Sequence, residues 1–103
     1  MNSAIKNGSS IKRIVITSSF ASIVNPQDYP FTYKEDQWNT ASPKVYSEKG
    51  KDAPGGDIYR TSKVRAEKAA WDLLEKHKPA FDLVTMCPPL VVRLPLFQLS
   101  LGL

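Results

Sequence analysis

The chain has 103 residues, 42% of them hydrophobic and 23% charged, and carries a formal net charge of +4. This composition is typical of one globular domain or of part of a larger one, and it excludes an intrinsically disordered chain. The basic residues are scattered among acidic ones without a block of five or more like charges. We therefore expect a solvated surface and no nucleic-acid partner.

The first two predicted elements are a short helix and a strand. Residues 1–8 are typical of the last two turns of a helix, with Gly8 suited to a left-handed C-terminal cap. Residues 11–19 form a nearly continuous β-branched run that ends in hydroxyl side chains. Such a run predicts a short strand that is buried on both faces, as in a parallel sheet.

A long connection follows, from Phe20 to Ile58. It is rich in Pro, Asp, Asn, Lys and Gly and has no sustained hydrophobic period, so we expect a structureless segment. A connection of this length is uncommon unless it has a function. Packing that stabilises the loop is the favoured role of Trp38, ahead of direct substrate contact. Gly55 and Gly56 are expected in a loop or hairpin, because no strand precedes them.

Residues 59–77 predict a helix that opens with Tyr59. Tyr59 and Lys63 are four residues apart and therefore share a helix face. At 100° per residue they fall in the middle of an apolar arc, which predicts that the pair lies at the centre of the buried stripe. Val64 and Trp71 form a second apolar stripe, which indicates packing on two sides. The rest of the first arc consists of Ser62, Ala66, Ala69, Ala70, Leu73 and Leu74.

A second apolar run, residues 81–89, ends in two prolines and predicts another strand. Strand, helix and strand in this order are typical of a parallel βαβ unit with a right-handed crossover. The predicted fold class is therefore α/β, a fragment of a doubly wound parallel sheet with a long connecting loop. Because ligands bind beyond the carboxyl ends of such strands, we expect Ser18, Ser19, Pro88 and the start of the helix to converge.

The single cysteine, the apolar tail and the first ten residues indicate the cellular compartment of the protein and whether it spans a membrane. Cys87, the single cysteine, ends an apolar strand and is expected to be a buried structural thiol and not a nucleophile. The apolar tail that begins at Leu90 is interrupted by Arg93 and Pro95 and is too short to span a membrane. Without an apolar signal segment among the first ten residues, the sequence predicts a cytoplasmic protein with no membrane partner.

The Tyr59 and Lys63 pair has a chemical interpretation. A phenol ionises near pH 10 and is a poor proton donor at neutral pH unless a neighbour stabilises its anion. A lysine ammonium beside the phenol provides that stabilisation, as general acid catalysis requires. The pattern Y-x-x-x-K also arises often by chance, so further residues are needed to support a catalytic interpretation.

Those residues are present, and together they resemble a known family. The order of motifs is similar to the second half of the nucleotide-binding domain of extended short-chain dehydrogenases/reductases, the NAD-dependent epimerase/dehydratase family. Three further segments resemble the dihydroflavonol-reductase-like and methylglyoxal-reductase-like ketone reductases: Phe20-Ala21-Ser22, Glu35-Asp36-Gln37-Trp38-Asn39 and Ala66-Glu67-Lys68-Ala69-Ala70-Trp71. The motifs that carry the first likeness are Thr17-Ser18-Ser19, Tyr59-x-x-Ser62-Lys63-x-x-Ala66-Glu67 and a strand that ends in Pro88.

The resemblance implies a Rossmann fold, an NADP cofactor with NAD as the alternative, no metal ion, and a small-molecule carbonyl or alcohol substrate. It implies that Ser19 hydrogen-bonds the substrate carbonyl oxygen and that Tyr59 donates a proton to it. Lys63 would stabilise the phenolate and bind the ribose hydroxyls. Pro88 and Val91 match positions whose backbone approaches the nicotinamide.

Two departures from the family pattern limit this interpretation. No G-x-x-G-x-x-G motif occurs in the sequence, and Arg93 stands where the family has a glycine. We therefore expect residues 1–92 to be a partial NAD(P)-binding domain and residues 93–103 to be a divergent apolar tail. The expected function is that of a carbonyl reductase that is inactive as this truncated chain, with a possible homodimer through the Tyr59 helix. The alternatives are a non-catalytic fragment and an interaction module derived from such a reductase.

Overall fold

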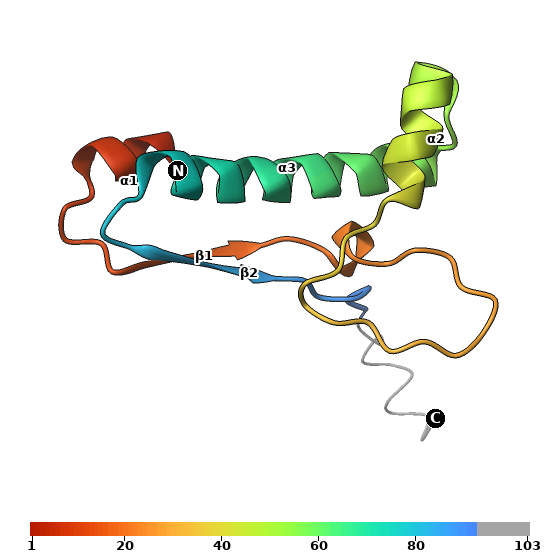
Figure 1. Ribbon diagram of the computed structural model, residues 1–103, viewed down its shortest axis with the longest axis horizontal. Coiled ribbons are helices and arrows are strands. Elements are labelled where there is room, and N and C mark those ends of the chain that lie inside the picture. The colour runs from red at the N-terminus through yellow and green to blue at the C-terminus, as the bar shows by residue number, and fades with distance from the viewer. Residues whose placement is uncertain (93–103) are drawn as a thin grey trace, which may run out of the picture.

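The structure, a computed structural model, describes residues 1–92, so the predicted tail at 93–103 lies outside the described residues. A long helix runs along one face of a two-stranded sheet, and a shorter helix crosses one end of it (Figure 1). In chain order the elements are α1 (Asn2–Asn7), β1 (Arg13–Thr17), the 3-10 turn η1 (Phe20–Ser22), α2 (Ala41–Lys49), the 3-10 turn η2 (Gly50–Asp52), α3 (Gly55–His77) and β2 (Asp82–Met86).

The two strands are parallel and joined through α3, which confirms the predicted α/β class and the βαβ unit. β1 and β2 pair in register from Arg13 opposite Asp82 to Thr17 opposite Met86. The backbone pairing continues beyond the strands, because the Ser18 amide donates to the Met86 carbonyl oxygen at 2.7 Å. The carboxyl ends of both strands therefore lie side by side, where the ligand crevice was expected.

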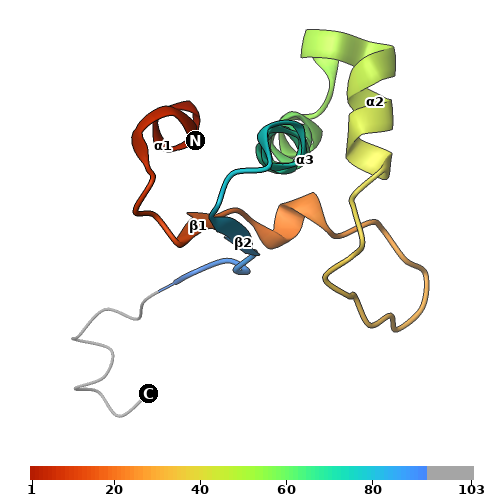
Figure 2. The same ribbon diagram turned by 60° about the vertical axis from the view of Figure 1, so that its left-hand side comes forward.

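α3 lies over one face of the sheet (Figure 2), and part of the hydrophobic core lies between them. Leu83 of β2 and Val64 of α3 are buried there. On the opposite face Val15 and Met86 are 55% and 58% exposed. The prediction of a strand buried on both faces is therefore wrong, because the helix covers one face only and the β-branched run alone does not reveal what covers each side.

The register of α3 differs from the predicted one. The helix begins at Gly55, so the two glycines form its first turn and are not a loop. Its buried positions recur at three-residue spacing on the side that contacts α2, η1 and β2. Tyr59 is 51% exposed, and the predicted buried stripe around it is wrong. The buried residues of the helix are Thr61, Val64, Glu67 and Ala70.

The segment from residue 20 to residue 58 is not structureless, since it holds η1, α2 and η2. One distant and one neighbouring side chain cap α2: the Asn25 carboxamide oxygen accepts from the amide of Ala41 at 3.0 Å, and that of Asn39 accepts from the Ser42 amide at 3.0 Å. Because Asn25 lies well before the helix, this cap leaves no local sequence signal. Trp38 is half-buried with the Lys68 ammonium 5.1 Å from its ring, a packing contact of the predicted kind.

Gly8 ends α1 because a side chain would not fit there, and not because the backbone is left-handed. The helix ends at Asn7 as expected, but Gly8 has φ −97°, so the predicted left-handed cap is wrong. A Cβ atom at Gly8 would lie 2.5 Å from the Ala4 carbonyl oxygen and 2.5 Å from Ile11 Cδ1. Glycine is needed here because the chain turns closely past the helix end.

Gly8→Ala is therefore expected to lower the free energy of unfolding by about 1–3 kcal/mol, the usual cost of overpacking. Urea denaturation followed by circular dichroism measures the change. Gly55→Ala is the matched control, because nothing lies within 4 Å of a Cβ built at that position. The control should leave stability unchanged or raise it by about 0.4–1 kcal/mol. Equal effects of both substitutions would contradict the steric explanation.

Candidate active site

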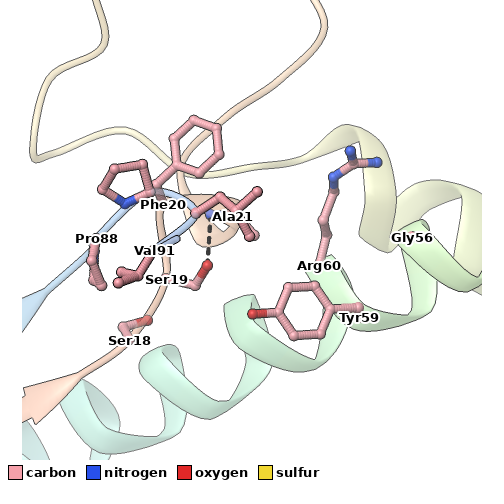
Figure 3. A pocket seen from close by; sticks show the side chains of 11 residues that line it. Ser18, Ser19, Phe20, Ala21, Gly56, Tyr59, Arg60, Pro88 and Val91 are labelled. Carbon is pink, nitrogen blue, oxygen red and sulfur yellow. Dashed lines mark hydrogen bonds between the residues drawn. The ribbon is translucent and has the colours of Figure 1, made fainter. Parts of the chain in front are cut away.

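A cavity of about 400 Å³ opens at the carboxyl ends of β1 and β2, beside the first turns of α3. Four of the five predicted site residues line it: Ser19, Tyr59, Pro88 and Val91. Figure 3 shows the Tyr59 hydroxyl directed toward the side of the pocket formed by Ser18 and Ser19. The topology thus brings together residues that lie about forty positions apart in the sequence.

The two adjacent serines have different hydrogen-bonding environments. The Ser18 hydroxyl donates to a Glu67 carboxylate oxygen at 2.6 Å and is therefore engaged within the protein. Ser19 Oγ accepts from the Ala21 amide at 3.2 Å, which orients the side chain and leaves its proton for another acceptor. This difference supports Ser19 as the residue that could donate to a ligand in the pocket.

Lys63 lies one turn after Tyr59 on α3. Its ammonium nitrogen is 5.7 Å from the centroid of the Tyr59 ring, a cation–π distance. Lys63 does not line the cavity, although it is close enough to the phenol to act on it electrostatically. The predicted pair is therefore brought together, at the edge of the pocket and not in a buried stripe.

The loop after β2 forms an apolar wall of the pocket. The Pro88 carbonyl oxygen accepts from the Phe20 amide at 3.1 Å, which ties this loop to the one after β1. Leu90 and Val91 continue the wall and are more than 80% exposed. An apolar wall of this kind suits an uncharged planar ring better than a phosphate group.

Two further residues of the site were not predicted from the sequence. Arg60 is the only charged side chain among the described residues that line the cavity, and its Nη1 lies 3.8 Å from Asp57. Adjacent residues of a helix point about 100° apart. Helix geometry therefore does not predict that Arg60 lines the same cavity as Tyr59. Glu67 was noted as part of the helix motif, but nothing in the sequence indicated its contacts.

Glu67 is buried, with 7% of its surface exposed, and accepts hydrogen bonds from three hydroxyl groups. Burial by itself raises the pKa of this carboxyl group. The hydrogen bonds from Ser18, Ser22 and Thr85, with a weaker one from Cys87, outweigh burial and leave the pKa below its ordinary value. The hydroxyl donors thus keep the Glu67 carboxylate ionised inside the fold.

Cys87, predicted to be buried, is only half-buried.

This lowered pKa predicts a loss of stability in acid. Because the folded pKa lies below the unfolded one, the contribution of Glu67 is complete above the unfolded value near 4.3 and is lost as the pH falls through the folded value. The hydrogen bond and ion pair with Arg13 also lower the pKa of the exposed Asp82, so this carboxyl group contributes a loss of the same sign. Unfolding free energies measured across the acid range should fall less for Glu67→Gln than for the unaltered chain. Glu75→Gln, at an exposed position of the same helix, should show the full decrease.

Residues 1–92 contain neither a membrane-spanning helix nor a cluster of metal-binding side chains. No helix in this part of the chain is long and apolar enough to cross a membrane. No group of three or more His, Cys, Asp or Glu side chains within it is arranged to hold a metal ion.

Comparison with known proteins identifies relatives of the chain. No protein-family model matches the sequence. It is 42% identical over 87 residues to the ketoreductase azaE of Aspergillus niger, a match that covers 79% of this chain and 22% of that protein. It is 33% identical over 84 residues to the NADPH-dependent methylglyoxal reductase GRE2 of Saccharomyces cerevisiae, covering 77% of this chain and 23% of that protein.

A solved structure gives the same result. The yeast methylglyoxal/isovaleraldehyde reductase Gre2 complexed with NADPH superposes with a TM-score of 0.70 at 32% identity, over 85% of this chain and 26% of that one. The chain thus spans about a quarter of the length of the relatives it matches. The motifs in the sequence predicted this result, and the chain is homologous to one part of these ketoreductases and methylglyoxal reductases.

Proposed function

We propose that this chain carries the carbonyl-reducing groups of an NADPH-dependent aldehyde or ketone reductase. The observation that carries the proposal is the convergence of Ser19 and Tyr59 on one cavity, with Lys63 next to the phenol. Residues 1–92 would form part of an NADP-binding Rossmann domain. The names of the relatives, a ketoreductase and an NADPH-dependent methylglyoxal reductase, support the same activity and cofactor.

The residues present fit the nicotinamide end of the cofactor. The apolar wall that contains Pro88 and Val91 suits the uncharged ring, and the Lys63 ammonium has donors for the ribose hydroxyls. The sequence has no glycine-rich motif for the pyrophosphate, so this chain offers only that end of a site. When bound, the nicotinamide supplies the hydride that adds to the carbonyl carbon.

The side chains of the pocket would handle the carbonyl oxygen. Negative charge develops on this oxygen as the carbonyl carbon is reduced, and the free Ser19 hydroxyl stabilises it by donating a hydrogen bond. Tyr59 transfers its phenolic proton to the same oxygen, so that C=O becomes CH–OH. The Lys63 ammonium stabilises the phenolate that remains. Arg60 places a positive charge at the rim of the pocket.

The exposed sheet face supports a second candidate, a non-catalytic interaction module. This face is apolar, and its residues Val15, Val84 and Met86 are each at least 37% exposed. Such a surface is suited to covering by another polypeptide.

Homodimerisation through α3, where Trp71 is half-buried, is a separate prediction that sedimentation of the chain would test. A cytoplasmic location also stays a prediction.

Titration of the purified chain with NADPH, followed by nicotinamide fluorescence, tests the proposal. Saturable binding would support the proposal, and Lys63→Ala should then weaken it about 10-fold to 100-fold, because a charge-assisted hydrogen bond contributes about 1.5–3 kcal/mol. Lys76→Ala, in the exposed last turn of the same helix, is the matched control and should bind normally. Failure of the unaltered chain to bind NADPH would favour a non-catalytic fragment of such a reductase or the interaction module.

A further inference from the structure

The carboxylate of Glu67 accepts hydrogen bonds from four other residues of the chain. Its Oε2 accepts from Ser18 Oγ at 2.6 Å and from Ser22 Oγ at 2.8 Å, and its Oε1 accepts from Thr85 Oγ1 at 2.8 Å. The Cys87 thiol lies 3.6 Å from Oε2. The donors come from the end of β1, from η1, from β2 and from the residue that precedes Pro88. They all lie at the strand ends that border the cavity.

No cation among residues 1–92 forms an ion pair with this buried carboxylate. Within residues 1–92 the ion pairs join Arg13 to Asp82 and Arg60 to Asp57, and neither involves Glu67. A buried carboxylate without a counter-ion is tolerated only when hydrogen bonds satisfy its oxygens. Hydrogen bonds depend on direction as well as distance, so the donors fix both the position and the orientation of the strand ends relative to α3.

The same helix carries the predicted catalytic groups. Glu67 lies four residues after Lys63 and eight after Tyr59, about two turns along one rigid element. On the opposite side of the pocket, Ser19 lies between two residues bonded to Glu67. Ser18 precedes it directly, and the Ser22 hydroxyl lies 2.8 Å from the Ser19 carbonyl oxygen. Glu67 therefore connects the Tyr59 side of the pocket to the Ser19 side without lining the cavity.

We propose that Glu67 is a positioning residue, which holds Ser19 and the Pro88 loop opposite Tyr59 through its contacts with Ser18, Ser22 and Cys87. It does not touch substrate or cofactor. The proposal rests on the proposed reductase function for its consequence in catalysis, whereas its structural content can be tested on the chain alone.

The first test is kinetic and uses Glu67→Gln. Glutamine has nearly the same shape but only one acceptor oxygen, and its amino group would face hydroxyl donors. Displacement of Ser19 by about 1 Å should lower kcat about 100-fold. The dissociation constant for NADPH should change by a smaller factor than kcat, because Lys63 is retained and only the Pro88 part of the apolar wall is displaced. Glu67→Asp, which keeps the charge, should restore part of kcat, and Glu75→Gln should behave like the unaltered chain.

The second test needs no enzymatic activity. The Ala21 amide donates to Ser19 Oγ, so its hydrogen-exchange rate reports the position of the serine. Glu67→Gln should speed exchange at Ala21 while circular dichroism shows α3 intact. Unchanged exchange at Ala21, or an unchanged kcat in an active chain, would overturn the positioning role. If the unaltered chain fails to bind NADPH, the reductase proposal fails, and exchange at Ala21 still decides the role of Glu67.

A titration of the unaltered chain covers the case in which Glu67→Gln does not fold. The carboxyl carbon of Glu67 and the amide resonances of Ser19 and Ala21 are followed by NMR as the pH is lowered. The groups that face Glu67 are three hydroxyls and the Cys87 thiol, and thiols ionise in the alkaline range. A shared acid midpoint supports the proposal. Resonances of Ser19 and Ala21 that ignore the Glu67 titration would refute it.

Discussion

Tyr59→Phe is expected to reduce the rate of NADPH-dependent carbonyl reduction by about 10²-fold to 10⁴-fold, the contribution of a positioned general acid. The substitution removes only the hydroxyl group that points into the pocket and keeps the ring beside the Lys63 ammonium (Figure 3). Stability should hardly change, because the ring is half-exposed and its hydroxyl makes no hydrogen bond among those found in residues 1–92. The rate is measured from NADPH consumption with an aldehyde substrate.

Tyr29→Phe is the matched control for this experiment. Tyr29 is 63% exposed and does not line the cavity, so loss of its hydroxyl should leave the rate unchanged. NADPH binding by Tyr59→Phe should also persist, which separates loss of proton transfer from loss of the cofactor. A Tyr59→Phe chain that reduces the aldehyde at the full rate would exclude Tyr59 as the proton donor.

Phe81→Ala is expected to cost about 3–5 kcal/mol of unfolding free energy, the usual effect of truncating a buried aromatic side chain. Phe81 is 5% exposed and directly precedes β2, at the end of the sheet nearest α1. Whole domains are stable by only about 5–15 kcal/mol. This single substitution should therefore greatly raise the fraction of molecules that are unfolded. Urea denaturation measures that fraction.

Phe31→Ala serves as the comparison for that loss. Phe31 is 38% exposed and makes edge-to-face contacts with Tyr29 and Tyr33 at centroid distances of 6.1 and 4.9 Å. Its removal should cost about 0.5–1.5 kcal/mol, the range for an aromatic pair. If both substitutions had the same effect, Phe81 would not belong to the core.

The sequence predicts the βαβ unit well, because the β-branched runs, the prolines after β2 and the long helical segment are local signals. It does not predict α2, of whose two capping side chains one, Asn25, is distant in the sequence. It also misplaces the buried face of α3. Apolar periodicity shows that a face can be buried, but which face is covered depends on α2 and the sheet, which are distant in sequence.

The candidate site shows the same division. The spacing of Tyr59 and Lys63 on a helix and the position of Ser19 after a strand are readable in the sequence, so the motif locates these residues. The contacts of Glu67 are not readable, because Ser18, Ser22 and Thr85 lie 18 to 49 positions away from it. A carboxylate in the three-residue series that includes Val64 was the one available sign that this helix face holds a polar cluster.

The backbone bonds that extend the sheet also constrain how a ligand can enter the pocket. The amides of Ser18 and Phe20 are bonded to the carbonyl oxygens of Met86 and Pro88, so the loops after the two strands must move as one body. Separating them would break hydrogen bonds of the sheet. Widening of the entrance must therefore come from the α3 side or from the chain beyond Pro88, and entry and exit rates should respond to substitutions there.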